Sequence, residues 1–113
     1  MIKQKLIDLL ETFGYPVSLQ GSYLAGSDLP NSFFTFWNFE TNLGYKSNKI
    51  VQIEYVFRVF FYSKDPTLVN TVLKQVRDLL IENNFHCSGD YDLETDVDSY
   101  LGREMEVRYL EAQ

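Results

Sequence analysis

Residues 32–62 read SFFTFWNFETNLGYKSNKIVQIEYVFRVFFY, and the alternation within this stretch decides the fold. Side chains that recur with period two lie on the same face of a strand. The segment 32–40 is aromatic on both faces, whereas 49–62 keeps one face apolar and places Gln, Glu and Arg on the other. We therefore predict two strands, 32–40 and 49–62, joined by turn-rich residues at 41–48. The uninterrupted apolar face of the second strand consists of Val51, Ile53, Tyr55, Phe57, Val59 and Phe61.

One helix is predicted before these strands in the sequence, and a second helix after them. In 2–13 the apolar residues recur with helical spacing, and Gly14 suits the left-handed residue that often follows a helix. A second apolar stripe with helical spacing runs through 68–80. It follows Asp65, which can cap free N–H groups, and Pro66, which suits the first helical position.

Shorter segments complete the predicted fold. Residues 16–20 and 103–111 alternate as strands, and 85–88 is either a further short strand or the approach to one. The predicted order is helix, three strands, helix, strand (α-β-β-β-α-β). Short connections favour a mainly antiparallel sheet of about four strands with two helices on one face. We predict a single α+β domain that spans residues 1–113.

Charge and composition limit the classes of partner. The formal net charge is −6 and the ten basic residues are scattered, whereas phosphate binding needs clustered Lys and Arg, so we expect no tight nucleic-acid binding. The amphipathic first segment, which includes Asp8 and Glu11, predicts neither a signal peptide nor a membrane span. Cys87 is the single cysteine, so no intrachain disulfide can form, and a cytosolic origin fits this composition.

An acidic segment is the first candidate for a metal site. Its carboxylates recur at every second position, as Asp90, Asp92, Glu94, Asp96 and Asp98. A calcium loop of the EF-hand type that began at Asp90 would need glycine at its sixth position and glutamate at its twelfth. Those positions hold Thr95 and Leu101. We therefore predict a solvated loop and no metal site, with calcium binding as the alternative.

The other polar pairs do not predict catalysis or a bound cofactor. His86 and Cys87 are adjacent on a predicted strand, so their side chains point to opposite faces. One His and one Cys also cannot supply the three or four ligands of a zinc site. Glu104 and Glu106 share a strand face, but Arg108 beside them indicates a charged surface rather than an acid–base pair. We predict no catalytic residues, no cofactor and a protein that is not an enzyme.

The aromatic strands give the main indication of function. Phe, Tyr and Trp make up 16% of the chain, more than two helices are expected to cover. The excess indicates either a dense core or a surface that is buried against a partner. In the second case, the predicted interface residues are Phe34, Phe36, Trp37, Arg58, Phe60, Tyr62, Asp92, Glu94 and Asp96.

Three segments carry a resemblance to a known class of protein. They are SFFTFWNFE at 32–40, FFYSKDPTLVNTVLKQVRDLLIENNF at 60–85 and GREMEVRYL at 102–110. In this order they resemble small tail proteins of phages and prophages, similar to the tail terminator or tail-completion proteins that join head and tail. The resemblance implies an α+β unit that assembles into a hexameric ring and closes the tail tube.

The resemblance also implies partners and a location. The partners would be other copies of the chain, tail-tube proteins and head-connector proteins, with loops 21–31 and 41–48 and the acidic segment as contacts. The location would be the virion, and the host cytoplasm during assembly. A negatively charged ring would repel DNA in its lumen. The alternative is a monomeric acidic interaction module, an adaptor or inhibitor that meets a basic partner.

Overall fold

The computed structural model describes residues 2–19, 30–93 and 100–113. In this part the chain forms two helices and five strands. They follow one another as α1 (Ile2–Glu11), β1 (Val17–Leu19), β2 (Ser32–Lys46), β3 (Lys49–Ser63), α2 (Pro66–Glu82), β4 (His86–Leu93) and β5 (Leu101–Ala112). The predicted α+β class and its two helices are therefore confirmed.

The five strands form one mixed sheet in the order β1-β2-β3-β5-β4. β1 pairs with β2 in parallel, and the other three neighbouring pairs are antiparallel. The prediction of about four strands is wrong by one, because 85–88 leads into a complete strand, β4, that pairs with β5. The segment lacks the alternating apolar residues of a typical strand, and it is held at the sheet edge by pairing with β5.

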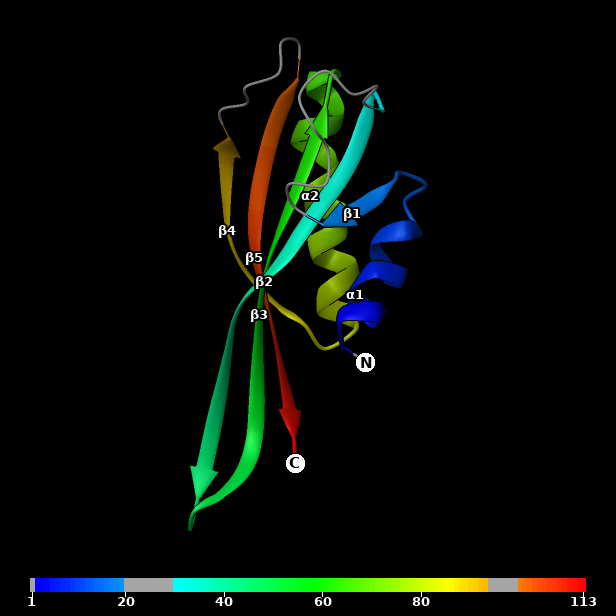
Figure 1. Cartoon of the computed structure of the whole chain (residues 1–113). Coiled ribbons are helices and arrows are strands. Elements are labelled where there is room, and N and C mark those ends of the chain that lie inside the picture. The colour runs from blue at the N-terminus through cyan, green and yellow to red at the C-terminus, as the bar shows by residue number, and fades with distance from the viewer. Residues whose placement is uncertain (1, 20–29, 94–99) are drawn as a thin grey trace.

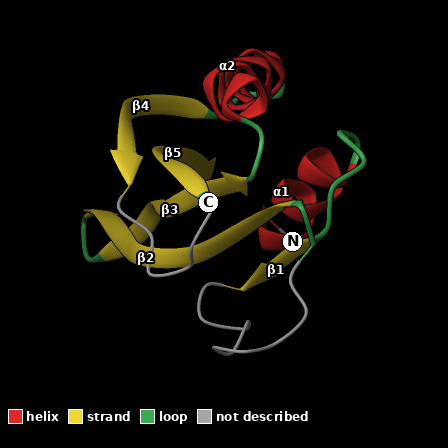
Figure 2. Cartoon of the chain, turned by 90° about the horizontal axis from the view of Figure 1, so that it is seen from above, coloured by secondary structure: helices red, strands yellow, loops and turns green. Residues whose placement is uncertain are grey.

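Both helices pack against the same face of the sheet, as Figures 1 and 2 show. The predicted apolar stripes of the helices and the apolar face of β3 meet there, because each buries its apolar side against the other. The buried cluster comprises Leu6, Leu10, Phe34, Phe36, Phe57, Val59, Phe61, Val72, Leu73, Val76, Leu80, Phe85, Met105 and Val107. This cluster is the hydrophobic core.

The backbone confirms the predicted start of α2, whereas α1 ends at Glu11, two residues before the predicted end. Asp65 lies at the N-cap of α2, where its Oδ1 accepts a hydrogen bond of 2.9 Å from the Thr67 N–H, and Pro66 is the first helical residue. Gly14 has φ 85° and Asn84 has φ 70°, so each reverses the chain shortly after a helix. The positions of α1 and α2 along the chain therefore follow from local chemistry.

The connection between β2 and β3 differs from the prediction. Residues 41–46 continue β2 instead of forming a turn, and the turn itself consists of Ser47 (φ 52°) and Asn48 (φ 65°). A two-residue turn with positive φ at both positions twists in the same sense as the strands it joins, and Asn tolerates that conformation. The register brings Lys46 opposite Lys49. The predicted loop 41–48 is thus the end of a long hairpin.

This hairpin and the end of the chain form an arm, defined here as residues 40–55 together with 109–113. Figure 1 shows that the arm runs well beyond the ends of both helices. The molecule measures 53 × 27 × 22 Å, and its radius of gyration is 15.2 Å. A compact domain of this length would have a radius of gyration of about 13 Å. The chain therefore consists of a packed body and a projecting arm.

Candidate interaction surface

The arm carries apolar side chains that the helices do not cover. Leu43 pairs with Ile53 and lies two positions beyond the pair of Thr41 and Tyr55, on the face that the helices cover in the body. Leu43, Tyr45 and Ile50 are 45%, 62% and 42% exposed. Single exposed apolar residues are ordinary, but several on one projecting element indicate a contact surface.

The arm also has unpaired strand edges. β1 pairs only with residues 34–36, so within the described ranges β2 has no neighbouring strand on its outer side from Trp37 to Lys46. On the other side of the arm, β4 follows β5 only as far as Arg108. Unpaired edges present backbone N–H and C=O groups to a further strand. The arm therefore combines an apolar face with edges that another chain can cover.

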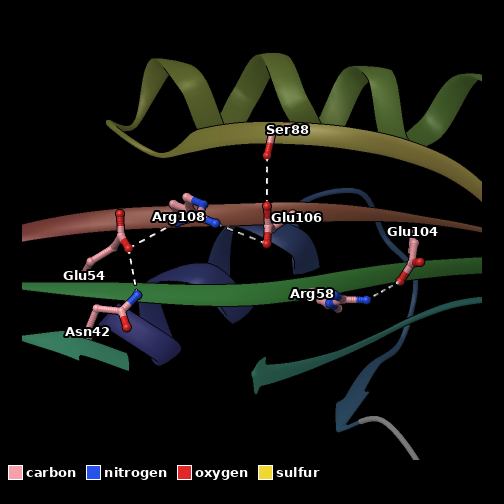
Figure 3. Close-up of polar contacts among 7 residues, drawn as sticks. All are labelled: Asn42, Glu54, Arg58, Ser88, Glu104, Glu106 and Arg108. Carbon is pink, nitrogen blue, oxygen red and sulfur yellow. Dashed lines mark hydrogen bonds and ion pairs between the residues drawn. The ribbon is translucent and has the colours of Figure 1, made fainter. Parts of the chain in front are cut away.

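The open face of the sheet, which is the face turned away from the helices, carries a polar network across four strands (Figure 3). Arg108 contacts Glu54 through Nη1 at 3.1 Å and Glu106 through Nη2 at 3.4 Å. Asn42 Nδ2 donates to Glu54 Oε1 at 2.9 Å, and Ser88 Oγ donates to Glu106 Oε2 at 3.1 Å. The Glu106 carboxylate, followed by that of Glu54, raises the pKa of Arg108, so this guanidinium remains charged.

Arg58 lies between this network and two exposed aromatic side chains. Its Nη1 is 3.7 Å from Glu104 Oε2, and its Cζ is 4.4 Å from the centroid of the Phe39 ring. Its Nε is buried and has no hydrogen-bond partner. Trp37 pairs with Arg58 across the strands and is 46% exposed. A partly exposed ion pair of this length contributes at most about 1 kcal/mol to stability.

A second aromatic cluster on the open face is packed within the chain itself. The rings of Phe33 and Tyr62 stack with centroids 5.2 Å apart, and Phe60 stacks on Tyr62 at 6.4 Å. Tyr100 packs edge-on against Phe33 at 5.8 Å, and its hydroxyl donates to the Pro30 carbonyl oxygen at 2.6 Å. Phe33, Phe60 and Tyr100 are buried. Of the two interpretations of the aromatic excess, packing within the chain therefore applies to these residues.

The structure corrects the placement of two predicted interface residues. Phe34 and Phe36 are 0% and 2% exposed and lie in the core beneath the helices. A folded chain therefore presents neither side chain to a partner. Both faces of 32–40 are aromatic, so alternation alone does not tell which face the helices cover.

The other predicted interface residues are distributed over the open face and the end of β4. Trp37 is exposed, Arg58 and Tyr62 are partly exposed, and Phe60 is buried in the second aromatic cluster. Asp92 is exposed and forms an ion pair of 3.0 Å with Arg103. Contact with a partner stays a prediction for these positions. The last two predicted residues, Glu94 and Asp96, lie outside the described residues.

The resemblance implied that loop 41–48 is a contact, but the extended hairpin and the exposed residues Leu43 and Tyr45 were not predicted individually, although the sequence holds a signal for them. Leu43 and Tyr45 alternate with polar residues, and Asn48 lies in a two-residue linker between paired lysines. Alternation on both sides of such a linker is typical of a hairpin. The clustering of Gly, Ser and Asn in 41–48 instead favoured a loop.

The candidates for chemistry lie apart from the arm. His86 pairs with Arg108 and Cys87 with Val107, so the two side chains point to opposite faces of β4 as predicted. Among the residues that the structure describes, no three His, Cys, Asp or Glu side chains are grouped closely enough to hold a metal ion. Three of the five acidic residues on which the calcium alternative depends lie outside the residues that the structure describes. Cys87 lines a cavity of about 160 Å³ whose other lining residues are Leu73, Arg77, Ser88, Gly89 and Met105.

Cys87 is expected to react slowly with thiol reagents. Burial raises the pKa of its thiol to about 11, an effect that the positive charge of Arg77 partly offsets. The thiolate is the reacting species, so at pH 8 its fraction is roughly a hundredfold lower than in an unfolded chain. The rate of modification by a disulfide reagent should rise about tenfold per pH unit from pH 8 to 10. Equal rates for the native and urea-unfolded chain would contradict this expectation.

Comparison with known proteins does not assign the chain to a family, since no family model matches it and no curated protein is similar to it. Neither helix of the described part is both long and apolar enough to cross a membrane. The arm and the open face are thus the features from which a function can be inferred.

Proposed function

We propose that this chain is a structural protein of a phage or prophage tail, of the tail terminator or tail-completion type. It assembles with copies of itself into a ring, with six subunits as the size that the resemblance implies. The ring lies at the head-proximal end of the tail and contacts tail-tube and head-connector proteins. The observation that supports this proposal best is the arm, which extends beyond the helices with exposed apolar side chains.

The exposed apolar residues of the arm supply a driving force for association. Burying a large apolar side chain contributes about 1.5–3 kcal/mol. Leu43, Tyr45 and Ile50 are each 42% or more exposed, so covering them gains part of this amount at each position. Together they account for several kcal/mol, which offsets part of the entropic cost of association. An arm that stayed in solvent would leave this free energy unused and its strand edges open to aggregation.

Charge supports a ring that surrounds DNA without holding it. The formal net charge of each subunit is −6. Several such subunits around one lumen produce a negative potential that repels phosphate groups. Tight DNA binding that weakens steeply with salt would contradict this part of the proposal.

Native mass spectrometry of the purified chain, alone and with tail-tube protein from the same phage, tests the proposal. We expect a closed oligomer of one size whose mass is a multiple of 13.2 kDa. A chain that stays monomeric at high concentration, even with tail-tube protein present, would contradict the ring. That outcome would favour the monomeric acidic module, for which a basic protein partner should then be sought.

A further inference from the structure

The tip of the arm, defined here as residues 41–53, and the rest of the chain carry opposite charge. Of the ten basic and sixteen acidic residues, two basic and no acidic residues fall within 41–53, which leaves a formal charge of −8 for the remainder. The two are Lys46 and Lys49, which lie directly opposite each other beside the turn. Both residues are exposed. The tip of the arm is therefore a positive site on a negative protein.

The open face of the sheet, from the body to the base of the arm, carries the complementary charge. The register places four carboxylates there, and among the described residues of β2, β3 and β5 only two guanidinium groups lie between them. The carboxylates are Glu40, Glu54, Glu104 and Glu106, and the guanidinium groups are those of Arg58 and Arg108. The surplus of two negative charges matches the two lysines of the tip. Exposed Trp37 and Phe39 lie on the same face, near Glu40.

The tip of one chain is held away from the open face of the same chain. The arm continues the strands that form the open face, so tip and face lie along one sheet (Figure 1). Contact between them therefore needs a second copy. A contact between two tips would place four lysines together, and like charges brought together destabilise an interface. Contact of a tip with an open face pairs opposite charges and covers the exposed side chains of Trp37 and Phe39.

We propose that the tip of the arm of one copy lies on the open face of a second copy, with Lys46 and Lys49 against the surplus carboxylates. This inference rests on the proposed self-assembly and names the surfaces that meet. The two surfaces differ, so the contact is head-to-tail, and each copy uses both surfaces when the chain of contacts closes into a ring.

Reversal of the two tip charges tests whether electrostatic attraction holds the tip on the open face. The variant Lys46→Glu with Lys49→Glu is compared with Lys64→Glu with Lys74→Glu, which changes two exposed lysines of the body. Both variants have a formal net charge of −10, because each reversal changes the charge by two. The dissociation constant of the oligomer is measured by analytical ultracentrifugation in 0.15 M salt. We expect it to rise about tenfold or more for the tip variant and to stay within about threefold for the control.

Crosslinking tests which surfaces meet. In a Cys87→Ala background, chains with Ser47→Cys at the tip are mixed with chains carrying Leu110→Cys on the open face, and a short bismaleimide is added. Leu110 is 48% exposed and pairs with Glu54. The control partner carries Gln4→Cys, an exposed position on α1. We expect crosslinks between positions 47 and 110, and far fewer between 47 and 4. Predominant links between two copies of position 47, or equal linking to position 4, would overturn the inference.

The two proposals fail in different ways. A wild-type chain that remains monomeric removes the proposed ring and this contact together. A wild-type chain that assembles, while both charge-reversed variants assemble equally well, overturns only the contact between tip and open face. Circular dichroism of each variant confirms that the compared chains are folded.

Discussion

Replacement of Phe57 by Ala is expected to lower the free energy of unfolding by about 3–5 kcal/mol. Phe57 is fully buried in the core between the sheet and the helices, so its removal leaves a cavity that the surrounding side chains fill only in part. Domains of this size unfold with a total of about 5–15 kcal/mol, so the variant should be close to the limit of stability. Urea denaturation followed by circular dichroism measures the change.

Trp37→Ala is the matched control, because it also removes a large aromatic side chain from the same pair of strands. Trp37 is 46% exposed and contacts Phe39 at a centroid distance of 6.4 Å. Its removal takes little surface out of the core, so we expect a loss of about 1 kcal/mol or less at protein concentrations where both variants are monomeric. Comparable losses for the two variants would show that the open face around Trp37 is part of the core.

Shortening the arm is expected to abolish assembly while the body stays folded. A variant that lacks residues 43–46 and 49–53 keeps the Ser47-Asn48 turn and joins it directly to Asn42 and Glu54, which already pair. It removes Leu43, Tyr45 and Ile50, whose burial is worth about 1.5–3 kcal/mol each when complete. The dissociation constant should therefore rise by about a hundredfold or more, because each 1.4 kcal/mol is a factor of ten. Native mass spectrometry and a thermal melt measure the two effects.

A control for the shortened arm changes an exposed apolar residue of the body. Ile81→Ser on α2 removes a side chain that is 53% exposed and lies on a helix of the body, outside the arm. We expect this variant to assemble as the wild-type chain does. If the shortened chain assembles normally, the arm is not the contact surface, and if it unfolds, the arm is required for the body to fold.

The elements whose chemistry is local were predictable. Asp65 and Pro66 begin α2 because an N-cap side chain and a fixed φ act within one turn of helix. Phe57 and its alternating neighbours reach the core because one face of β3 is apolar without interruption. Neither conclusion depends on what lies across the sheet. For β4 the sequence indicated only a short strand or its approach at 85–88, because the residues that follow are typical of a loop and become a strand by pairing with β5.

The residues of the candidate surface could not be predicted from the alternation of apolar and polar residues alone. Phe34 and Trp37 are both aromatic and lie in the same strand, yet one is fully buried and the other about half exposed. Which face of 32–40 becomes the core depends on where α1 and α2 pack, and that is a property of the whole chain. The arm was missed for a related reason. Residues 41–48 have the composition of a loop, and pairing with β3 makes most of them part of a strand.

The sequence by itself determined the class of fold, the ends of the helices and the apolar face of β3. These follow from periodicity and capping, which act between residues a few positions apart. The tertiary structure alone decided that the hairpin extends as an arm, which aromatic face is covered, and that two lysines lie opposite each other at the arm tip. Each of these depends on register and packing between residues far apart in the chain, and a single strand's pattern is compatible with either outcome.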